Sequence, residues 1–170
     1  ILAYPFNWFE ASYYYVDINN KLYSEIPEFS GGQSLKDKGF NAKFLIRRET
    51  NRFPAIAIGF RDMAGTGLFE GEYLVASKRL NSIDFTLGLG WGTMSKDTFS
   101  NPLKKIDNSF SNRTKQAGSI GGEFSSESFF SGDLSIFGGL EIFLPYLNGA
   151  RLKVELDSID YNKEGYPPIK

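Results

Sequence analysis

The residues that could carry chemistry in this chain of 170 amino acids are its carboxylates and its cationic side chains, because histidine and cysteine are both absent. Their absence removes disulfides, thiolate and imidazole metal sites, cysteine nucleophiles and every Ser-His-Asp arrangement. Two carboxylates at a suitable separation can hydrolyse a glycosidic bond, but the sequence does not fix that separation. The candidates for such a pair are Glu70, Glu72, Glu141, Glu155, Asp157 and Asp160.

A structural role competes with catalysis for these carboxylates. Glu72, Glu141 and Glu155 alternate with apolar residues, and lysine and arginine residues are interleaved with them along the chain. That arrangement is typical of ion pairs on the polar face of a sheet rather than of an acid/base pair. We therefore expect no catalytic residues and no enzymatic activity, and the sequence indicates no metal site and no cofactor.

The cationic residues leave two interpretations open. Lys43, Arg47, Arg61 and Lys78 could attract an anionic polymer, or they could pair with the acidic residues. The chain has 19 Lys and Arg residues against 20 Asp and Glu residues, a formal net charge of -1. A chain with this balance lacks the basic field that nucleic-acid binding requires, so we expect no nucleic-acid partner.

Alternation with a period of two dominates the sequence and predicts an all-β chain that forms a single domain over residues 1–170. Between Ile83 and Gly92, for example, large apolar residues alternate with small or polar ones. No apolar run approaches the roughly 20 residues that a transmembrane helix needs. The expected strands are 7–17, 39–49, 54–62, 71–79, 83–92, 133–143 and 150–157, with a weaker candidate at 117–124.

The connections between these strands alternate in length. Short turns are expected at 50–53, 81–82 and 148–149, and long polar segments at 18–38, 63–70 and 93–132. In an antiparallel meander, successive connections lie at opposite ends, so all the short turns fall at one end and all the long loops at the other. This asymmetry is typical of outer-membrane β-barrels.

The alternation alone does not decide which face of the sheet meets water. A soluble periplasmic β-barrel or sandwich that binds carbohydrate, with its apolar side chains inside, is therefore an alternative to a transmembrane barrel. Strands of about 9 to 11 residues favour the transmembrane barrel, because soluble strands average nearer 5 or 6 residues. The side chains then expected to face the lumen, along a possible path for a glycan, are Lys43, Arg47, Arg61, Glu72, Lys78, Glu141, Arg151, Lys153 and Glu155.

Several stretches together resemble the YjbH family of bacterial outer-membrane proteins, which is linked to exopolysaccharide and capsule production. The resemblance covers most of the chain from about residue 33 to 164 and is most specific in its central block. The matching stretches are Pro54-Ala55-Ile56-Ala57-Ile58-Gly59-Phe60-Arg61-Asp62, Asp84-Phe85-Thr86-Leu87-Gly88-Leu89-Gly90-Trp91-Gly92, and residues 37–44, 65–69, 72–73, 76–79, 130–132, 137–141, 153–157 and 160–161.

The resemblance implies an antiparallel meander β-barrel in the outer membrane of a Gram-negative bacterium. It further implies a part in secreting or assembling a surface polysaccharide, with outer-membrane lipid, the polysaccharide and periplasmic export proteins as partners. It implies no reaction and no catalytic residue.

Seven clear strands are an odd number, whereas bacterial single-chain barrels are normally even. We therefore expect about eight strands, with the eighth in 117–124 or 157–170, or else a part of a larger barrel. Residues 1–5 contain neither an initiator methionine nor a charged segment followed by an apolar one. The chain is accordingly expected to be a mature or excised piece.

Overall fold

The computed structural model describes residues 1–65, 67–113 and 128–161, which form an antiparallel sheet of eight strands. The strands follow one another in space in the same order as in the chain, so the predicted all-β meander is confirmed. The strands are β1 (Leu2–Phe6), β2 (Phe9–Leu22), β3 (Ser34–Arg47), β4 (Ala55–Arg61), β5 (Gly71–Leu80), β6 (Ile83–Gly92), β7 (Ser135–Leu144) and β8 (Ala150–Leu156).

Helix is scarce in the described residues. A single turn, α1 (Pro27–Ser30), lies between β2 and β3, and two 3-10 turns, η1 (Pro102–Lys105) and η2 (Asn108–Ser111), lie between β6 and β7. None of the helices in these parts of the chain has the length and apolar character that crossing a bilayer requires.

The strand that completes the set of eight is β1, which the sequence pattern did not predict. Residues 2–6 do not alternate and include Pro5. β1 pairs with β2 and is the first strand of the described sheet. Its pairing shifts register between Ala3 and Phe6, and such an irregularity tolerates the proline at position 5. Of the places where an eighth strand was expected, 117–124 lies outside the described residues, and the described part of 157–170 contains no strand.

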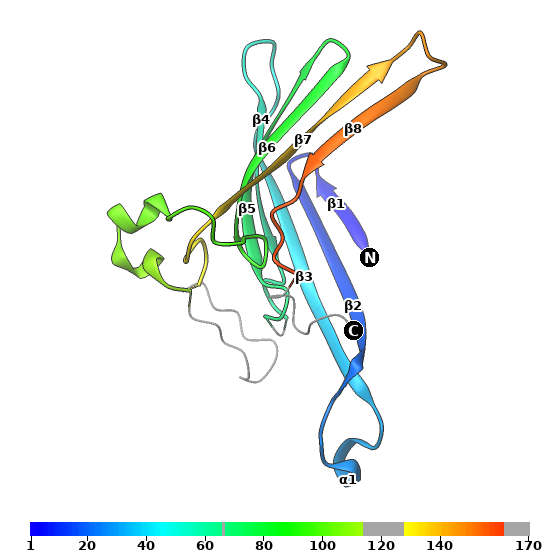
Figure 1. The fold of residues 1–170 in the computed structure, drawn as a ribbon, viewed down its shortest axis with the longest axis vertical. Coiled ribbons are helices and arrows are strands. Elements are labelled where there is room, and N and C mark those ends of the chain that lie inside the picture. Colours follow the sequence, from blue (N-terminus) through cyan, green and yellow to red (C-terminus); the bar gives the residue numbers. More distant parts are fainter. Residues whose placement is uncertain (66, 114–127, 162–170) are drawn as a thin grey trace.

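Two strands extend beyond their predicted ends. β2 continues to Leu22 and β3 begins at Ser34, so the expected loop at 18–38 is shortened to residues 23–33. Figure 1 shows this pair as a ribbon that projects past the other strands to α1. The outer parts of β2 and β3 were not predicted because they are rich in polar residues and lack an apolar alternation. They still form strands, since backbone pairing between two strands does not require an apolar face. There the hydroxyl of Ser34 donates to Asp17 across the pair.

The connections alternate in length as predicted. Residues 7–8, 48–54, 81–82 and 145–149 form the short connections, and Figure 1 shows the last three at its upper end. The connections through 23–33, 62–70 and 93–134 are longer, and their described parts lie toward the opposite end. Asn81, Asn148 and Gly149 adopt the positive φ angles that tight hairpin turns require.

Each face of the sheet can be followed across neighbouring strands, since directly opposed residues in antiparallel strands point to the same side. One row runs Lys43, Gly59, Tyr73 and Gly90 across β3 to β6, and defines what we call the polar face. The alternate row runs Ala42, Phe60, Glu72 and Trp91, and defines the apolar face.

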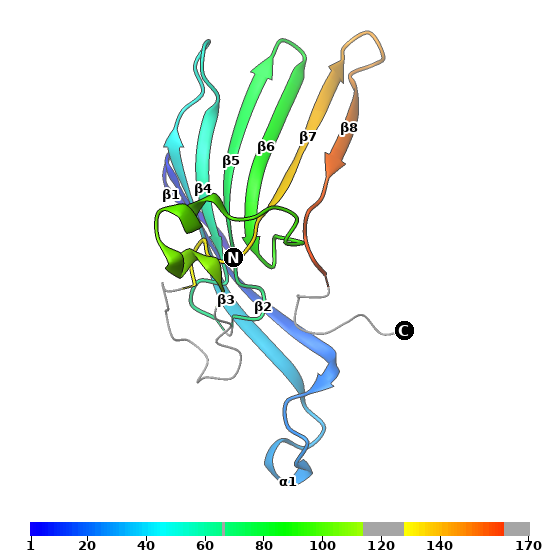
Figure 2. The same ribbon diagram turned by 60° about the vertical axis from the view of Figure 1, so that its left-hand side comes forward.

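The apolar face is covered only near the end with the long loops. There the connection between β6 and β7, shown in green in Figure 2, packs beside the sheet. Phe130 contacts Phe60 and Trp91, with ring centroids 5.6 and 5.2 Å away. Among the described residues, the buried hydrophobic side chains are Ala42, Ala57, Trp91 and Leu134.

Candidate functional site

A row of charged side chains crosses the polar face near the short connections. The register places Arg79 opposite Asp84, Asp84 opposite Glu141, and Glu141 opposite Lys153, so that four neighbouring strands, β5 to β8, each contribute one charge. The two-residue turn at 81–82 sets the pairing of β5 with β6, and the connection at 145–149 sets that of β7 with β8, because the length of a hairpin turn fixes which residues are opposed.

These charges form local ion pairs. Arg79 donates to both carboxylate oxygens of Asp84, with its Nε 2.8 Å from Oδ1. Arg151 Nη1 lies 2.5 Å from Glu141 Oε1, and Lys153 Nζ lies 2.7 Å from Glu155 Oε1. Because these side chains are largely exposed, the pairs add little to stability, and their main effect is to hold charges of both signs in place.

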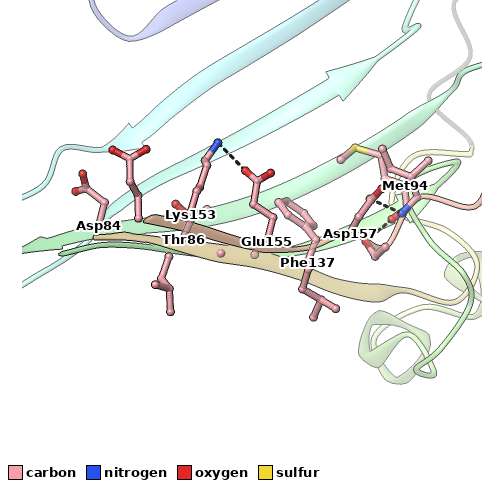
Figure 3. A pocket seen from close by; sticks show the side chains of 14 residues that line it. Asp84, Thr86, Met94, Phe137, Lys153, Glu155 and Asp157 are labelled. Atoms are coloured by element: carbon pink, nitrogen blue, oxygen red, sulfur yellow. Dashed lines mark hydrogen bonds and ion pairs between the residues drawn. The ribbon is translucent and has the colours of Figure 1, made fainter. Parts of the chain in front are cut away.

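The charged row borders a groove on the polar face with a cavity volume of about 510 Å³. Figure 3 shows Asp84, Lys153 and Glu155 rising from the same side of the strands, with Phe137 and Asp157 farther along. Ser158 donates to the carbonyl of Met94 and so holds the chain after β8 against the end of the groove. The lining residues are Asp84, Thr86, Met94, Phe137, Gly138, Gly139, Leu140, Glu141, Lys153, Glu155, Leu156, Asp157, Ser158 and Ile159.

Aromatic rings lie against glycines at three places on the polar face. Phe137 is directly opposite Gly88 on the neighbouring strand, and a Cβ atom at Gly88 would overlap the ring. The same relation joins Tyr73 to Gly59 and Tyr14 to Gly39. The missing side chain lets each ring lie close to the backbone. These three glycines therefore have a packing role.

The structure places six of the nine expected lumen residues on the polar face, and one of the six, Arg61, lies at the end of β4. Glu141, Arg151, Lys153 and Glu155 surround or adjoin the groove. Lys43 lies on β3, on the same face but outside the groove, 4.0 Å from Glu10.

Two of the expected residues lie near strand ends. Arg61, the last residue of β4, is opposite Gly71 on the polar face. Arg47 lies beyond a register shift in β3, and its guanidinium stacks on the ring of Phe53 at 3.9 Å. Neither residue lines the groove.

Glu72 and Lys78 do not share a face with the other expected lumen residues. Glu72 is opposite Phe60 and Trp91, and Lys78 is opposite Phe85, so both belong to the apolar face. The local pattern of β5 is misleading because Tyr73 and Val75 point to the polar side. The turn at 81–82 is the signal that identifies the correct face, since it opposes Leu80 to Ile83 and every earlier residue of β5 accordingly.

Glu72 anchors the long connection between β6 and β7 to the apolar face. Arg113 donates two hydrogen bonds of 2.8 Å to the two carboxylate oxygens of Glu72, and the backbone N–H of Phe130 donates a third, of 2.9 Å. Arg113 also lies 3.0 Å from Glu70. Burial alone would lower the pKa of Arg113, but the hydrogen bonds and charges of Glu72 and Glu70 raise it above its ordinary value.

Lys78 lies at the other end of β5. Its Nζ donates to Glu49 at 2.9 Å and to the carbonyl of Thr50, and Glu49 also accepts from the backbone N–H of Arg79. These bonds attach the turn between β3 and β4 to β5. The long aliphatic stem of the lysine lets it begin on the apolar face and place its charge at the end of the sheet.

A second polar cluster lies on the polar face near the long loops. Tyr14 donates to Asp37 at 3.2 Å, and Asp62 accepts from the backbone N–H of Phe69 at 3.1 Å. Burial raises the pKa of Asp62 to about 6, although hydrogen bonds from Tyr14 and Phe69 oppose the shift. Within the described segments, no three acidic residues gather as metal ligands would.

Comparison with known proteins adds three findings. A model of the YjbH family, described as "exopolysaccharide biosynthesis protein YbjH", matches residues 2–167. The protein described as "uncharacterized lipoprotein YjbH" from Escherichia coli (strain K12) is 41% identical over 163 residues, which are 94% of this chain but only 23% of that protein. No solved structure matches the chain.

Proposed function

Since the chain belongs to the YjbH family of exopolysaccharide biosynthesis proteins, we propose that it forms part of an outer-membrane β-barrel that takes part in exopolysaccharide secretion or assembly. The role is non-catalytic. Each of the groove carboxylates Asp84, Glu141 and Glu155 already holds a cation, which fits a wall better than an acid/base pair. The polar face lines the path of the polymer, and the apolar face meets lipid.

The observation that carries this proposal is the large exposed area of the apolar face. Leu87 on β6 is 63% exposed, and Leu152 and Val154 on β8 are 53% and 55% exposed. An aqueous protein rarely leaves so large a continuous apolar surface open to water. Such a surface is stable in contact with the hydrocarbon of a bilayer. A transmembrane barrel has this kind of surface, because the antiparallel strands of its wall turn their apolar side chains outward.

The proposed barrel is larger than eight strands. β1 and β8 are the two edges of the sheet and have no partner on their outer sides within the described residues. An unpaired edge is costly in hydrocarbon, so further strands must complete it. The chain matches only about a quarter of the length of its Escherichia coli relative, which leaves ample polypeptide for that purpose.

The orientation follows the usual asymmetry of these barrels, with the short connections toward the periplasm and the long loops outside. Periplasmic export proteins would therefore approach the end that carries the turns at 48–54, 81–82 and 145–149.

Two adjacent residues on β6 test which face meets lipid. Leu87 belongs to the apolar face and Thr86 to the polar face. We expect Leu87→Cys in the intact protein, reconstituted in liposomes, to react with a bilayer-dissolved maleimide, and Thr86→Cys to react with a charged aqueous one. The reverse pattern, or a protein that stays soluble and monomeric without detergent, would contradict the proposal.

The same pair gives a functional readout in cells. A lysine on the lipid face near the middle of a barrel strand costs about 2 to 4 kcal/mol. Leu87→Lys should therefore reduce insertion and exopolysaccharide release, whereas Thr86→Lys should preserve insertion. Outer-membrane fractionation and the amount of released polymer measure the two effects.

A further inference from the structure

Part of the groove floor carries no side chain. Gly139 lies two residues after Phe137 on the same face of β7, and Gly88 lies beneath the Phe137 ring. The ring is half-buried: it lies on the backbone of β6, meets the Tyr73 ring edge to face with centroids 6.2 Å apart, and borders the groove. A flat aromatic surface of this kind packs well against the C–H face of a sugar ring, which is itself apolar.

The rim supplies the polar half of sugar recognition. Glu141, Lys153 and Glu155 stand beside the floor, and Asp84 and Thr86 border it from β6. Carboxylate oxygens accept hydrogen bonds from hydroxyl groups, and such charge-assisted bonds are about twice as strong as neutral ones. Because neighbouring ion pairs hold these side chains in place, less conformational entropy is lost when a ligand binds.

The charge of the groove discriminates between classes of glycan. The three cations at its rim are engaged by carboxylates: Arg79 by Asp84, Arg151 by Glu141 and Lys153 by Glu155. Asp157 adds a fourth carboxylate, which accepts from the Tyr161 hydroxyl at 2.6 Å. Lys96 lies near enough to Asp157 to act on its charge. A glycan rich in carboxylates would have to displace existing ion pairs, whereas uncharged sugars meet no such penalty.

We propose that this groove binds uncharged sugar residues of a glycan, with Phe137 as the stacking surface and the carboxylates around it as hydrogen-bond acceptors. The proposal rests on the proposed function and adds the position of a sugar subsite and its preference for neutral over acidic residues. It makes Phe137 a binding residue of the polar wall.

Titration of the intact protein in detergent micelles with defined oligosaccharides tests the subsite. The probes are the uncharged maltoheptaose and chitohexaose and the acidic heptagalacturonate, with calorimetry or saturation-transfer NMR as the readout. We expect at least one uncharged probe to bind at least tenfold more tightly than the acidic one. Failure of both uncharged probes to bind, or tighter binding of the acidic probe, would overturn the proposal.

Substitution of the aromatic residue gives a matched comparison. Phe137→Ala should weaken binding about tenfold, the amount that one aromatic stacking contact contributes, and Phe137→Trp should retain it. Tyr14→Ala is the control, because it removes the equivalent ring over Gly39 outside the groove, whereas Tyr73 contacts the Phe137 ring itself. Equal losses from Phe137→Ala and Tyr14→Ala, or no loss from Phe137→Ala, would refute the assigned site.

The two proposals can fail separately. If Leu87→Cys reacts from the lipid phase and Phe137→Ala binds sugar as well as the unaltered protein, the groove is refuted and the barrel stands. If Thr86→Cys reacts from the lipid phase instead, the polar face is the outer one, and both proposals are refuted.

Discussion

Glu72 illustrates how completely the role of one carboxylate depends on its surroundings. Its side chain is 1% exposed and that of its partner Arg113 is 11% exposed, so both charges are withdrawn from water. The two parallel hydrogen bonds and the third bond from Phe130 recover the energy that withdrawal costs. Removing either partner would leave the other charge buried and incompletely satisfied.

We therefore expect Glu72→Gln to reduce the free energy of unfolding by about 3 kcal/mol, since it breaks a buried charge pair. The connection between β6 and β7 should detach first, so trypsin should cleave near Lys104 and Lys105 sooner than in the unaltered protein. Denaturant titration and limited proteolysis measure the two effects.

Glu141→Gln is the matched control for this change. It breaks the pair with Arg151, whose side chain is 63% exposed, and should cost less than about 1 kcal/mol without altering cleavage. Similar losses in the two variants would contradict an anchoring role for Glu72.

The placement of Glu72 also marks a limit of sequence-based prediction. The polar character of Lys153 and Glu155 identified their face because β8 keeps a consistent alternation. Glu141 was assigned to the same face from the apolar residues opposite to it in the β7 pattern, although Phe137 and Phe143 interrupt that pattern. β5 carries polar and apolar residues on both sides, so its composition predicts the wrong face for Glu72. Arg113 was not predicted at all, because a partner 41 positions away leaves no periodic signal in the sequence.

At the level of the strands, the pairs of glycine and aromatic residues connect composition to packing. Gly59, Gly88 and Gly39 each lie directly opposite the ring that covers them. A β-strand glycine normally weakens a sheet, because it adds no side-chain packing and increases the entropy of the unfolded chain. Here the ring from the neighbouring strand occupies the space and offsets that loss.

We predict that Gly59→Ala lowers the free energy of unfolding by about 1 to 3 kcal/mol, because the new methyl group displaces the Tyr73 ring. Combined with Tyr73→Ala, the substitution should cost less than the sum of the two single changes, since the clash is absent. Denaturant titrations of the three variants measure this coupling.

Gly32→Ala in the connection between β2 and β3 provides the comparison. No atom lies within 4 Å of the position that the new methyl group would occupy there, so the stability should change by less than about 0.5 kcal/mol. Strict additivity of Gly59→Ala and Tyr73→Ala would argue that the ring does not depend on the glycine.

Strand prediction succeeded where alternation was strong and failed where other forces determine pairing. β6 was predicted with its observed bounds because Ile83, Phe85 and Leu87 repeat without interruption. β1 contains Pro5, and the outer parts of β2 and β3 are polar. These segments are identified as strands by their pairing with a neighbouring strand and not by their own sequence pattern. Backbone hydrogen bonding is independent of side-chain type, and periodicity cannot report it.

For the whole molecule, the open sheet bears on the size of the proposed barrel. Closure of eight strands would place β1 and β8 side by side at the usual spacing of about 4.8 Å. In the structure, β1 pairs with β2 and β8 pairs with β7, and neither pairs with the other. The polar face would then continue onto strands outside the described residues.

A cysteine pair distinguishes the two possibilities. Ala3→Cys on β1 and Val154→Cys on β8 both belong to the apolar face, and we expect them not to form a disulfide in the intact protein under mild oxidation. Leu140→Cys with Val154→Cys is the positive control, because these residues are directly opposed on β7 and β8. Efficient coupling between positions 3 and 154 would show that eight strands close on themselves.

The two charges at the ends of β5 have a consequence for how deeply the proposed barrel would sit in a bilayer. Glu72 and Lys78 bound the uncharged stretch of that strand on the apolar face, six residues or roughly 20 Å apart. Outer membranes are thinner than average, and barrels present an apolar band of about 25 Å to them. In such a barrel, vertical displacement in either direction would draw Lys78 or the Glu72–Arg113 contact into the acyl chains, so this strand would fix the immersion depth of its neighbours.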